Sequence, residues 1–334
     1  MGYTQSQHDH SLFTKNHHSK FTALLIYVDD SILGGNGNDE ISKVKQLLDQ
    51  QFKIKDLGSL KYFLGLEVSY SNRGISLCQR KYALDLLSDT GFLLSKPVPT
   101  PMIKSPHLHQ HDIAPYDKTE LYRQLVDRFL YLTNTKPDLS FVVQQLSQFM
   151  ANPTIHHHKA MTRVLRYIRG SPSQGLLYPT TSILHLKGYS DSDWATCPDT
   201  RKSISGYCMF LGGSLISWKS KKQNTFSMSS SEAEYRDLAI ASCEFQWITY
   251  LLADFCILYK QPSLMFCEND SSRYIATNSV FHERTKHIEI DYHIVREWLQ
   301  KKLFHLFPIR TIDQAADILT KALEPRIFHT LMLQ

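Results

Sequence analysis

The chain lacks the features of membrane-spanning, secreted and disordered proteins. None of its apolar runs approaches the roughly 18–20 residues that cross a bilayer, so no membrane partner is expected. Its 14 glycines and 13 prolines are too few and too scattered for a fibrous or disordered chain. The polar start, Met-Gly-Tyr-Thr-Gln-Ser, has no apolar signal region, so an intracellular protein, cytoplasmic or nuclear, is expected.

Cysteine is also scarce, and the cysteines present do not have the spacing of a metal-binding motif. The six cysteines form no Cys-x-x-Cys pair, which argues against a zinc site and against a disulfide scaffold. What the chain does have is a 42% hydrophobic composition over 334 residues, which favours two packed globular domains. Its net charge of +5 permits a polyanionic partner without requiring one.

Residues 1–95 are predicted to form strands and helices around an acidic turn. Apolar segments at 23–28 and 32–33 flank Asp29 and Asp30, which predicts a β-hairpin with two carboxylates at its tip. Adjacent carboxylates usually mark a solvated turn. In a buried, aromatic-flanked setting, however, like charges persist most readily beside a divalent cation. Further elements are expected as helices at 39–52 and 80–90 and strands at 62–70 and 75–78.

The middle of the chain, residues 96–180, is predicted to be a linker followed by helices. Pro97, Pro99 and Pro101 exclude a helix or a central strand at its start. Apolar periodicity then predicts helices at 120–133, 139–150 and 157–169.

Residues 181–325 change to alternating strands and helices. This order predicts a mixed five-stranded sheet with flanking helices, an α/β (α+β) fold, with residues 326–334 as a tail. Strands are expected at 183–190, 206–211, 215–218, 264–267 and 304–310, and helices at 229–252, 271–277, 291–302 and 313–322. In the third of these helices Asp291 lies four residues after His287, and the two are interpreted as a structural pair.

Four acids in this region are candidates for one metal-binding cluster. Asp191 and Glu268 follow predicted strands, Glu234 lies in the first turns of the long helix, and Asp317 lies on the last helix. Strand ends and neighbouring helix turns meet at one edge of an open sheet. Three of the acids have a named structural alternative: Asp191 as a turn residue, Glu234 in a capping box that starts at Ser231, and Asp317 as a charge near a helix N-terminus. Their joint occurrence in this order of elements favours the cluster.

The chain resembles, over nearly its whole length, the polymerase and ribonuclease H regions of copia-type LTR retrotransposon Pol polyproteins. The motifs that carry the resemblance include Tyr27-Val28-Asp29-Asp30, Lys55-Asp56-Leu57-Gly58, Ser190-Asp191-Ser192-Asp193-Trp194, Ser231-Glu232-Ala233-Glu234-Tyr235 and Ala316-Asp317-Ile318-Leu319-Thr320-Lys321. The resemblance implies a truncated polymerase palm in 1–95, a helical thumb or connection in 96–180 and a ribonuclease H-like domain in 181–325.

The same resemblance implies the site residues. Asp29 and Asp30 match the metal-binding pair of the palm, and Asp191, Glu234, Glu268 and Asp317 match the ribonuclease H acids. The implied chemistry is hydrolysis of RNA in an RNA/DNA hybrid with two Mg²⁺ or Mn²⁺ ions. Other retroelement proteins are further expected partners. Phosphate contacts, or equally well solvated charges, are expected at Arg201, Lys202, Lys219, Lys221 and Lys222.

Three departures from the family pattern lower the expected activity. Residues 1–26 do not supply the earlier palm Asp that the family's polymerase needs, so loss of polymerase activity is expected. Glu268 stands where the family usually has Asp; a displacement of about 1 Å costs on the order of a hundredfold in rate, although Asp270 could substitute. Asp127 replaces a small Gly and is expected to bury a charge. The expectation is weak or absent nuclease activity, and the alternative is a noncatalytic nucleic-acid-binding retroelement remnant.

Overall fold

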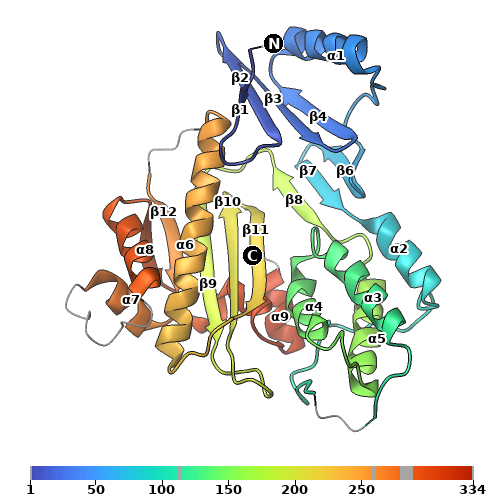
Figure 1. The fold of residues 1–334 in the computed structure, drawn as a ribbon, viewed down its shortest axis with the longest axis vertical. Coiled ribbons are helices and arrows are strands. Elements are labelled where there is room, and N and C mark those ends of the chain that lie inside the picture. Colours follow the sequence, from blue (N-terminus) through green and yellow to red (C-terminus); the bar gives the residue numbers. More distant parts are fainter. Residues whose placement is uncertain (1, 111–113, 258–260, 279–288, 333–334) are drawn as a thin grey trace. The chain divides into compact units, whose positions relative to one another are not determined.

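The computed structural model describes residues 2–110, 114–257, 261–278 and 289–332 (Figure 1). The chain divides into two compact units. The first comprises Met1–Leu64 with Glu244–Lys260, and the second comprises Gly65–Cys243 with Gln261–Gln334. His287 lies outside the described residues.

The first unit contains an antiparallel sheet and one complete helix. Strands β1 (Thr4–Gln5), β2 (Leu12–His17), β3 (Lys20–Tyr27) and β4 (Asp30–Gly35) follow one another in the sheet, and helix α1 (Asn38–Phe52) follows them in the chain. Leu12, Leu24 and Val44 are buried, because alternate strand residues and one stripe of α1 face inwards. The last described element before residue 65 is β5 (Tyr62–Phe63).

The predicted hairpin at Asp29 and Asp30 is confirmed, but its predicted burial is wrong. Residues Val28 and Asp29 connect β3 to β4, and Tyr27 pairs with Asp30 across the turn. Both aspartates are exposed, and Val28 is 83% exposed. Two apolar strands predict a hairpin, but they do not predict how far its tip projects from the core.

The second unit begins with a small antiparallel sheet that joins distant parts of the chain. Strands β6 (Leu66–Ser71) and β7 (Gly74–Cys78) form a hairpin, and β7 also pairs with β8 (Leu176–Pro179). Strand β8 is not predicted from the sequence, because four residues next to a Gly-containing loop give too short an apolar pattern.

Helices of the second unit pack around one apolar core. They are α2 (Arg80–Asp89), α3 (Thr119–Leu132), the short η1 (Pro137–Leu139), α4 (Ser140–Ser147) and α5 (Ile155–Gly170). Leu86, Phe129, Val142 and Leu165 belong to the same buried cluster. Asp127 is exposed on α3, so the expected buried charge is wrong; the apolar stripe of α3 faces away from this position.

A mixed five-stranded sheet forms the other part of the second unit, which confirms the predicted fold class. Its strands are β9 (Leu186–Asp193), β10 (Ile204–Leu211), β11 (Ser214–Lys222), β12 (Ser263–Cys267) and β13 (Phe304–Pro308), in the order β11-β10-β9-β12-β13. Strands β9 to β11 are antiparallel, whereas β12 runs parallel to both β9 and β13.

Helix α6 (Ser230–Asp254) lies over one face of this sheet and buries Ala233, Leu238 and Ala241 (Figure 1). Its residues from Glu244 onwards belong to the first unit. Helices α7 (Asp270–Thr277) and α8 (Glu289–Gln300) come from the part of the chain between β12 and β13.

The C-terminal segment differs from the prediction. The expected helix at 313–322 is replaced by two short 3-10 helices, η4 (Thr311–Asp313) and η5 (Ala315–Leu319), separated by Gln314 in an extended conformation. The expected tail contains helix α9 (Pro325–Met332), whose Phe328 and Leu331 are buried in the core. In the described part of the chain, no helix has both the length and the apolar character needed to span a bilayer.

Candidate metal centre

Asp191 lies at the middle of the five-stranded sheet. It belongs to β9, the central strand, rather than to a turn after it, so its alternative role as a turn residue is wrong. Asp191 pairs with Gly206 on β10 and is only 2% exposed. On the other side of β9, Cys267 of β12 pairs with Ser190. Glu268 directly follows β12, so the parallel pairing brings Glu268 close to Asp191, which lies near the C-terminal end of β9.

Asp317 reaches the same edge from η5. The Gln314 side chain fixes this segment, because its Nε2 donates to the Ser190 carbonyl at 3.1 Å and its Oε1 accepts from the Ala316 N–H at 3.3 Å. Asp317 lies in the first turn of η5, near its N-terminus as the structural alternative expects, and its side chain is buried there. Carboxylate oxygens of Asp191, Glu268 and Asp317 all lie within 4.8 Å of one another. These three acids are called the acidic cluster below.

Glu234 lies next to the acidic cluster but outside that 4.8 Å group. It comes from the first turns of α6 and is 7% exposed, and its Oε2 is buried without a hydrogen-bond partner. Burial, followed by the negative charge of Asp191, raises the pKa of Glu234 to about 9. Glu234 therefore presents a buried carboxyl oxygen without a hydrogen-bond partner beside the acidic cluster.

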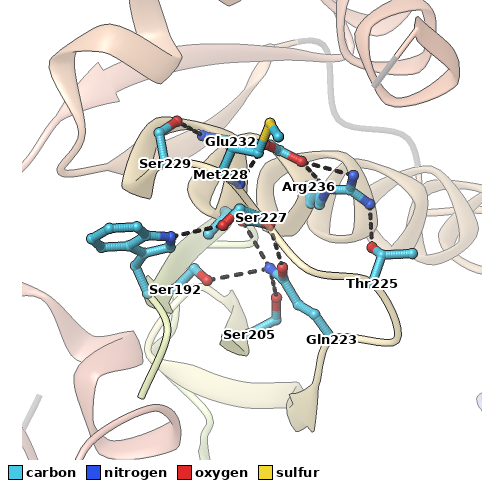
Figure 2. Close-up of polar contacts among 11 residues, drawn as sticks. Ser192, Ser205, Gln223, Thr225, Ser227, Met228, Ser229, Glu232 and Arg236 are labelled. Carbon is cyan, nitrogen blue, oxygen red and sulfur yellow. Dashed lines mark hydrogen bonds and ion pairs between the residues drawn. The ribbon is translucent and has the colours of Figure 1, made fainter. Parts of the chain in front are cut away.

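The start of α6 is capped by Glu232 and not by Glu234. The Glu232 N–H donates to the Ser229 hydroxyl at 3.2 Å, and the Glu232 carboxylate accepts from the Met228 N–H at 2.8 Å (Figure 2). These capping contacts therefore lie two residues earlier than the capping box predicted at Ser231. This shift leaves the Glu234 side chain available for the acidic cluster.

Gln223 holds the connection between β11 and α6 in place. Its Nε2 lies 2.9 Å from both the Ser205 hydroxyl of β10 and the Ala233 carbonyl of α6, and 3.3 Å from the Ser192 hydroxyl of β9 (Figure 2). Its Oε1 accepts from the Ser227 hydroxyl at 3.0 Å. One buried amide thus ties two strands to the first turn of the helix that carries Glu234.

Lys321 and Thr320 contact the acidic cluster directly. The Lys321 Nζ lies 2.8 Å from Asp317 Oδ1 and 3.2 Å from Asp191 Oδ1. The Thr320 hydroxyl donates to the other oxygen of Asp191. Although burial lowers the pKa of Lys321, the charges of Asp191 and Asp317 outweigh it and raise the pKa above its ordinary value. Lys321 is therefore a cation in the site.

Asp317 and Asp237 have raised pKa values because both are buried and because both lie near other negative charges. Burial, followed by the charge of Asp191, raises the pKa of Asp317 to about 7. Burial and the charges of Glu234 and Asp191 raise the pKa of the fully buried Asp237 well above its ordinary range. Carboxylate oxygens are the donors that Mg²⁺ and Mn²⁺ prefer, so the residues present fit a divalent cation.

The other predicted site residues lie elsewhere. Asp29 and Asp30 lie side by side in the first unit and do not belong to the acidic cluster. Asp270, considered as a substitute for Glu268, is 90% exposed and pairs with Arg273 on α7. The Glu268 side chain reaches the cluster despite its extra methylene and accepts a hydrogen bond from the Thr311 hydroxyl.

The predicted phosphate contacts have different environments. Lys219 and Lys221 are exposed on β11 and two residues apart, so they share one face of the strand. Lys222 is engaged instead with the Gln148 Oε1 at 2.7 Å and the Cys197 Sγ at 3.2 Å. Arg201 is exposed, and the Lys202 ammonium donates to the Asn224 carbonyl.

Sequence reasoning misses the residues that support the cluster: Gln223, Gln314, Asp237, Thr320 and Lys321. Thr320 and Lys321 stand in the motif that carries the family resemblance, and their positions three and four residues after Asp317 are a signal that could have found them. Gln223 and Gln314 give no such signal in the sequence, because a single glutamine between apolar segments has no distinctive pattern.

Known proteins similar to this chain belong to the family that its sequence motifs indicate. A family model described as reverse transcriptase (RNA-dependent DNA polymerase) matches residues 1–104. The chain is 41% identical to the retrovirus-related Pol polyprotein from transposon RE1 of Arabidopsis thaliana, over 98% of this chain and 22% of that protein. It is 31% identical to a putative transposon Ty5-1 protein of Saccharomyces cerevisiae, over 70% of this chain and 77% of that protein.

Among solved structures, the foamy viral protease-reverse transcriptase in complex with RNA/DNA hybrid is similar at a TM-score of 0.47 and 12% identity, over 90% of this chain and 37% of that chain. The chain spans less than a quarter of the RE1 polyprotein. The chain is 41% identical to the RE1 polyprotein over 98% of its own length, and it covers 77% of the Ty5-1 protein. It therefore belongs to the copia-type retrotransposon Pol polyprotein family.

Proposed function

We propose that the second unit hydrolyses the RNA strand of RNA/DNA hybrids with divalent cations. The observation that carries the proposal is the acidic cluster, in which carboxylates from β9, from the end of β12 and from η5 lie within 4.8 Å of one another. Family membership supports a nucleic-acid substrate, and the net charge of +5 is compatible with one.

Asp191, Glu268 and Asp317 would hold the cations, with Glu234 as a further ligand. When bound, such ions supply charge neutralisation at the scissile phosphate and a water activated at neutral pH. The chain itself supplies rigid positions. Asp191 is fixed in the central strand, and Gln314 ties η5 to that strand. The Gln223 contacts fix the first turn of α6, from which Glu234 extends.

DNA polymerisation is not part of this proposal. Among the described residues, the acidic cluster is the one group of three or more potential metal ligands in close proximity, and Asp29 and Asp30 are not in it. The exposed aspartate pair of the first unit has no third ligand nearby in the part of the chain that the structure describes. We propose that this chain, by itself, does not synthesise DNA.

The test is cleavage of a labelled RNA/DNA hybrid by the full chain in Mg²⁺ or Mn²⁺. Cleavage by the wild type, its loss in Asp191→Asn and its retention in Asp270→Asn are expected. Asp270→Asn is the matched control because Asp270 is exposed and lies two residues from Glu268. A wild type that cleaves no faster than Asp191→Asn contradicts the hydrolytic function.

A second candidate function, nucleic-acid binding without catalysis, is favoured by the exposed Lys219 and Lys221 on one face of β11. It predicts hybrid binding that weakens as salt concentration rises and that survives Asp191→Asn. Binding that does not depend on salt concentration contradicts it.

A further inference from the structure

We propose that Lys321 is an internal counter-ion of the acidic cluster, which occupies the carboxylates of Asp191 and Asp317 in the metal-free protein and leaves them when a divalent cation binds. The inference rests on the proposed hydrolytic function and concerns how cation binding at that site is regulated. Cation binding at the acidic cluster is then an exchange, in which a divalent cation replaces the Lys321 ammonium.

Lys321 and Thr320 contact the same carboxylate oxygens of Asp191 and Asp317 that would bind a cation. Lys321 Nζ contacts one oxygen of Asp317 and one of Asp191, and the Thr320 hydroxyl contacts the other oxygen of Asp191. Both oxygens of the most central acid are therefore occupied by two consecutive residues. A divalent cation held by Asp191 and Asp317 must compete with at least the ammonium group.

The charge balance explains why the ammonium is there. Asp191 and Asp317 are almost completely buried, and Glu234 and Asp237 add two further buried carboxyls nearby. Buried like charges are costly unless they are paired with a cation or neutralised by protons. Lys321 supplies one positive charge to this group. A divalent cation that arrives while the ammonium remains would be repelled by it, since both are positive and both need the same carboxylates.

Lys321 is also the partner that can move. Its side chain is 30% exposed, whereas those of Asp191 and Asp317 are 2% and 6% exposed. A lysine has a flexible four-carbon stem, so its ammonium can turn to solvent without a change in the backbone. The two aspartates lie on β9 and η5, which packing and the Gln314 contacts hold in place. Displacement of the lysine is therefore the expected response to a cation.

Cation affinity of the full chain tests the exchange without any measurement of activity. Mn²⁺ binding is measured by electron paramagnetic resonance of the free ion for the wild type, Lys321→Met and Lys321→Arg. Lys301→Met is the matched control, because Lys301 is exposed and its contacts, with Glu297 and the Trp298 ring, are local to α8. We expect Lys321→Met to bind Mn²⁺ at least about tenfold more tightly than the wild type, and Lys321→Arg to bind no more tightly than the wild type.

A second measurement uses the wild type alone and so does not depend on the folding of a variant. Lysines are reductively methylated with and without Mg²⁺, and the modification of each is quantified by peptide mass spectrometry. The reactivity of Lys321 is expected to rise several-fold when Mg²⁺ is added, because its amine is released to solvent, and that of Lys301 is expected to stay constant. Unchanged reactivity of Lys321 in a protein that binds Mg²⁺ overturns the exchange.

The outcomes separate this inference from the proposed function. A wild type that binds Mn²⁺, with equal or weaker binding in Lys321→Met, overturns the role of Lys321 and leaves the hydrolytic function standing. Absence of Mn²⁺ binding in both proteins overturns both proposals. Tighter binding in Lys321→Met, together with no hybrid cleavage by the wild type, supports the exchange and contradicts hydrolysis.

Discussion

Gly206 lies directly opposite Asp191 in the β9–β10 pair, and its missing side chain leaves the space into which Leu319 and Thr320 pack. A Cβ atom at Gly206 would lie 2.6 Å from the Thr320 Cγ2 and 2.8 Å from the Leu319 Cβ. The absence of one methyl group thus sets how closely the segment that carries Asp317 approaches the sheet.

Gly206→Ala is expected to lower the free energy of unfolding by about 1–3 kcal/mol, because the new methyl group overpacks the contact with η5. It should also weaken Mn²⁺ binding, since Asp317 moves with η5. Urea unfolding and Mn²⁺ titration measure the two effects. Gly213→Ala is the control, as its Cβ would meet the nearest atom, in Ser182, at an ordinary 3.6 Å. Equal stability of the two variants would show that η5 is not held against Gly206.

Gln223→Leu is expected to destabilise the protein by about 3 kcal/mol, because Leu has a similar size but leaves the buried Ser205 hydroxyl and the Ala233 carbonyl without this partner. The destabilisation should appear as a lower urea midpoint with an unchanged m-value. Gln300→Leu, at the exposed end of α8, serves as the control for the chemical change. A Gln223→Leu protein as stable as this control would mean that the amide contributes nothing to folding.

Glu268→Asp is expected to reduce Mn²⁺ affinity by about tenfold, because the shorter side chain withdraws from both the acidic cluster and the Thr311 hydroxyl. The sequence-based expectation is the reverse: Asp, the usual family residue, would restore a better-placed ligand and increase activity. Titration with Mn²⁺ and hybrid cleavage rates decide between them. Asp270→Glu, two residues away on an exposed side chain, should change neither.

Asp138 is expected to make stability fall as pH rises. Burial raises its pKa above the ordinary value of 3.8, and Lys136 and the Tyr167 hydroxyl, 2.6 Å away, offset only part of this. Because the folded-state pKa is the higher one, the contribution of Asp138 is fully present below about pH 3.8 and is lost as pH rises through the folded-state pKa.

Replacement by Asn keeps an acceptor for Tyr167 and removes the ionisation. Asp138→Asn should therefore gain stability relative to the wild type as pH rises from 4 towards neutrality, as measured by urea unfolding at each pH. Asp85→Asn, an exposed position on α2, should show no such trend. A constant difference between Asp138→Asn and the wild type at every pH would refute the raised pKa.

The double variant Lys219→Gln/Lys221→Gln is expected to bind an RNA/DNA hybrid more weakly than the wild type. The slope of log K against the logarithm of salt concentration should become shallower by about 2, one for each phosphate that the lysines no longer neutralise. Lys222→Gln should instead lower stability, since it removes the contacts with Gln148 and Cys197. Filter binding over a range of salt concentrations and thermal unfolding separate these effects. An unaltered salt slope in the double variant would exclude this face of β11 as a phosphate-binding surface.

The sequence predicts the strands and the identities of the clustered acids better than it predicts the surroundings of those acids. Asp191 and Glu268 can be placed at one edge because the strands predicted at 183–190 and 264–267 end directly before them, and the observed strands β9 and β12 overlap these ranges. The 3-10 helix that carries Asp317 cannot be predicted from the sequence. Its conformation depends on the hydrogen bond from the Gln314 side chain to the carbonyl of Ser190, which lies far away in the chain. Glu232 and Glu234 both stand near a helix start, and only the position of Ser229 decides which one caps.

Helix α9 and strand β8 escape prediction for a related reason. Each is short and becomes stable through a distant partner: Phe328 and Leu331 enter the helical core, and β8 pairs with β7 about a hundred residues earlier. The exposed tip at Val28 is the opposite case, in which an apolar pattern indicates burial that the first unit does not provide.

The order in which the acidic cluster is assembled along the chain also determines when it can exist. Asp191 is synthesised first, Glu234 and Glu268 follow, and Asp317 with its neighbour Lys321 comes last. Glu268 is in place only when β12 pairs with β9, and Asp317 is in place only when η5 packs against Gly206. A ribosome that has not yet released Asp317 therefore carries a chain whose proposed cation site is incomplete, so any hydrolytic capacity would arise only after this segment has been translated and folded.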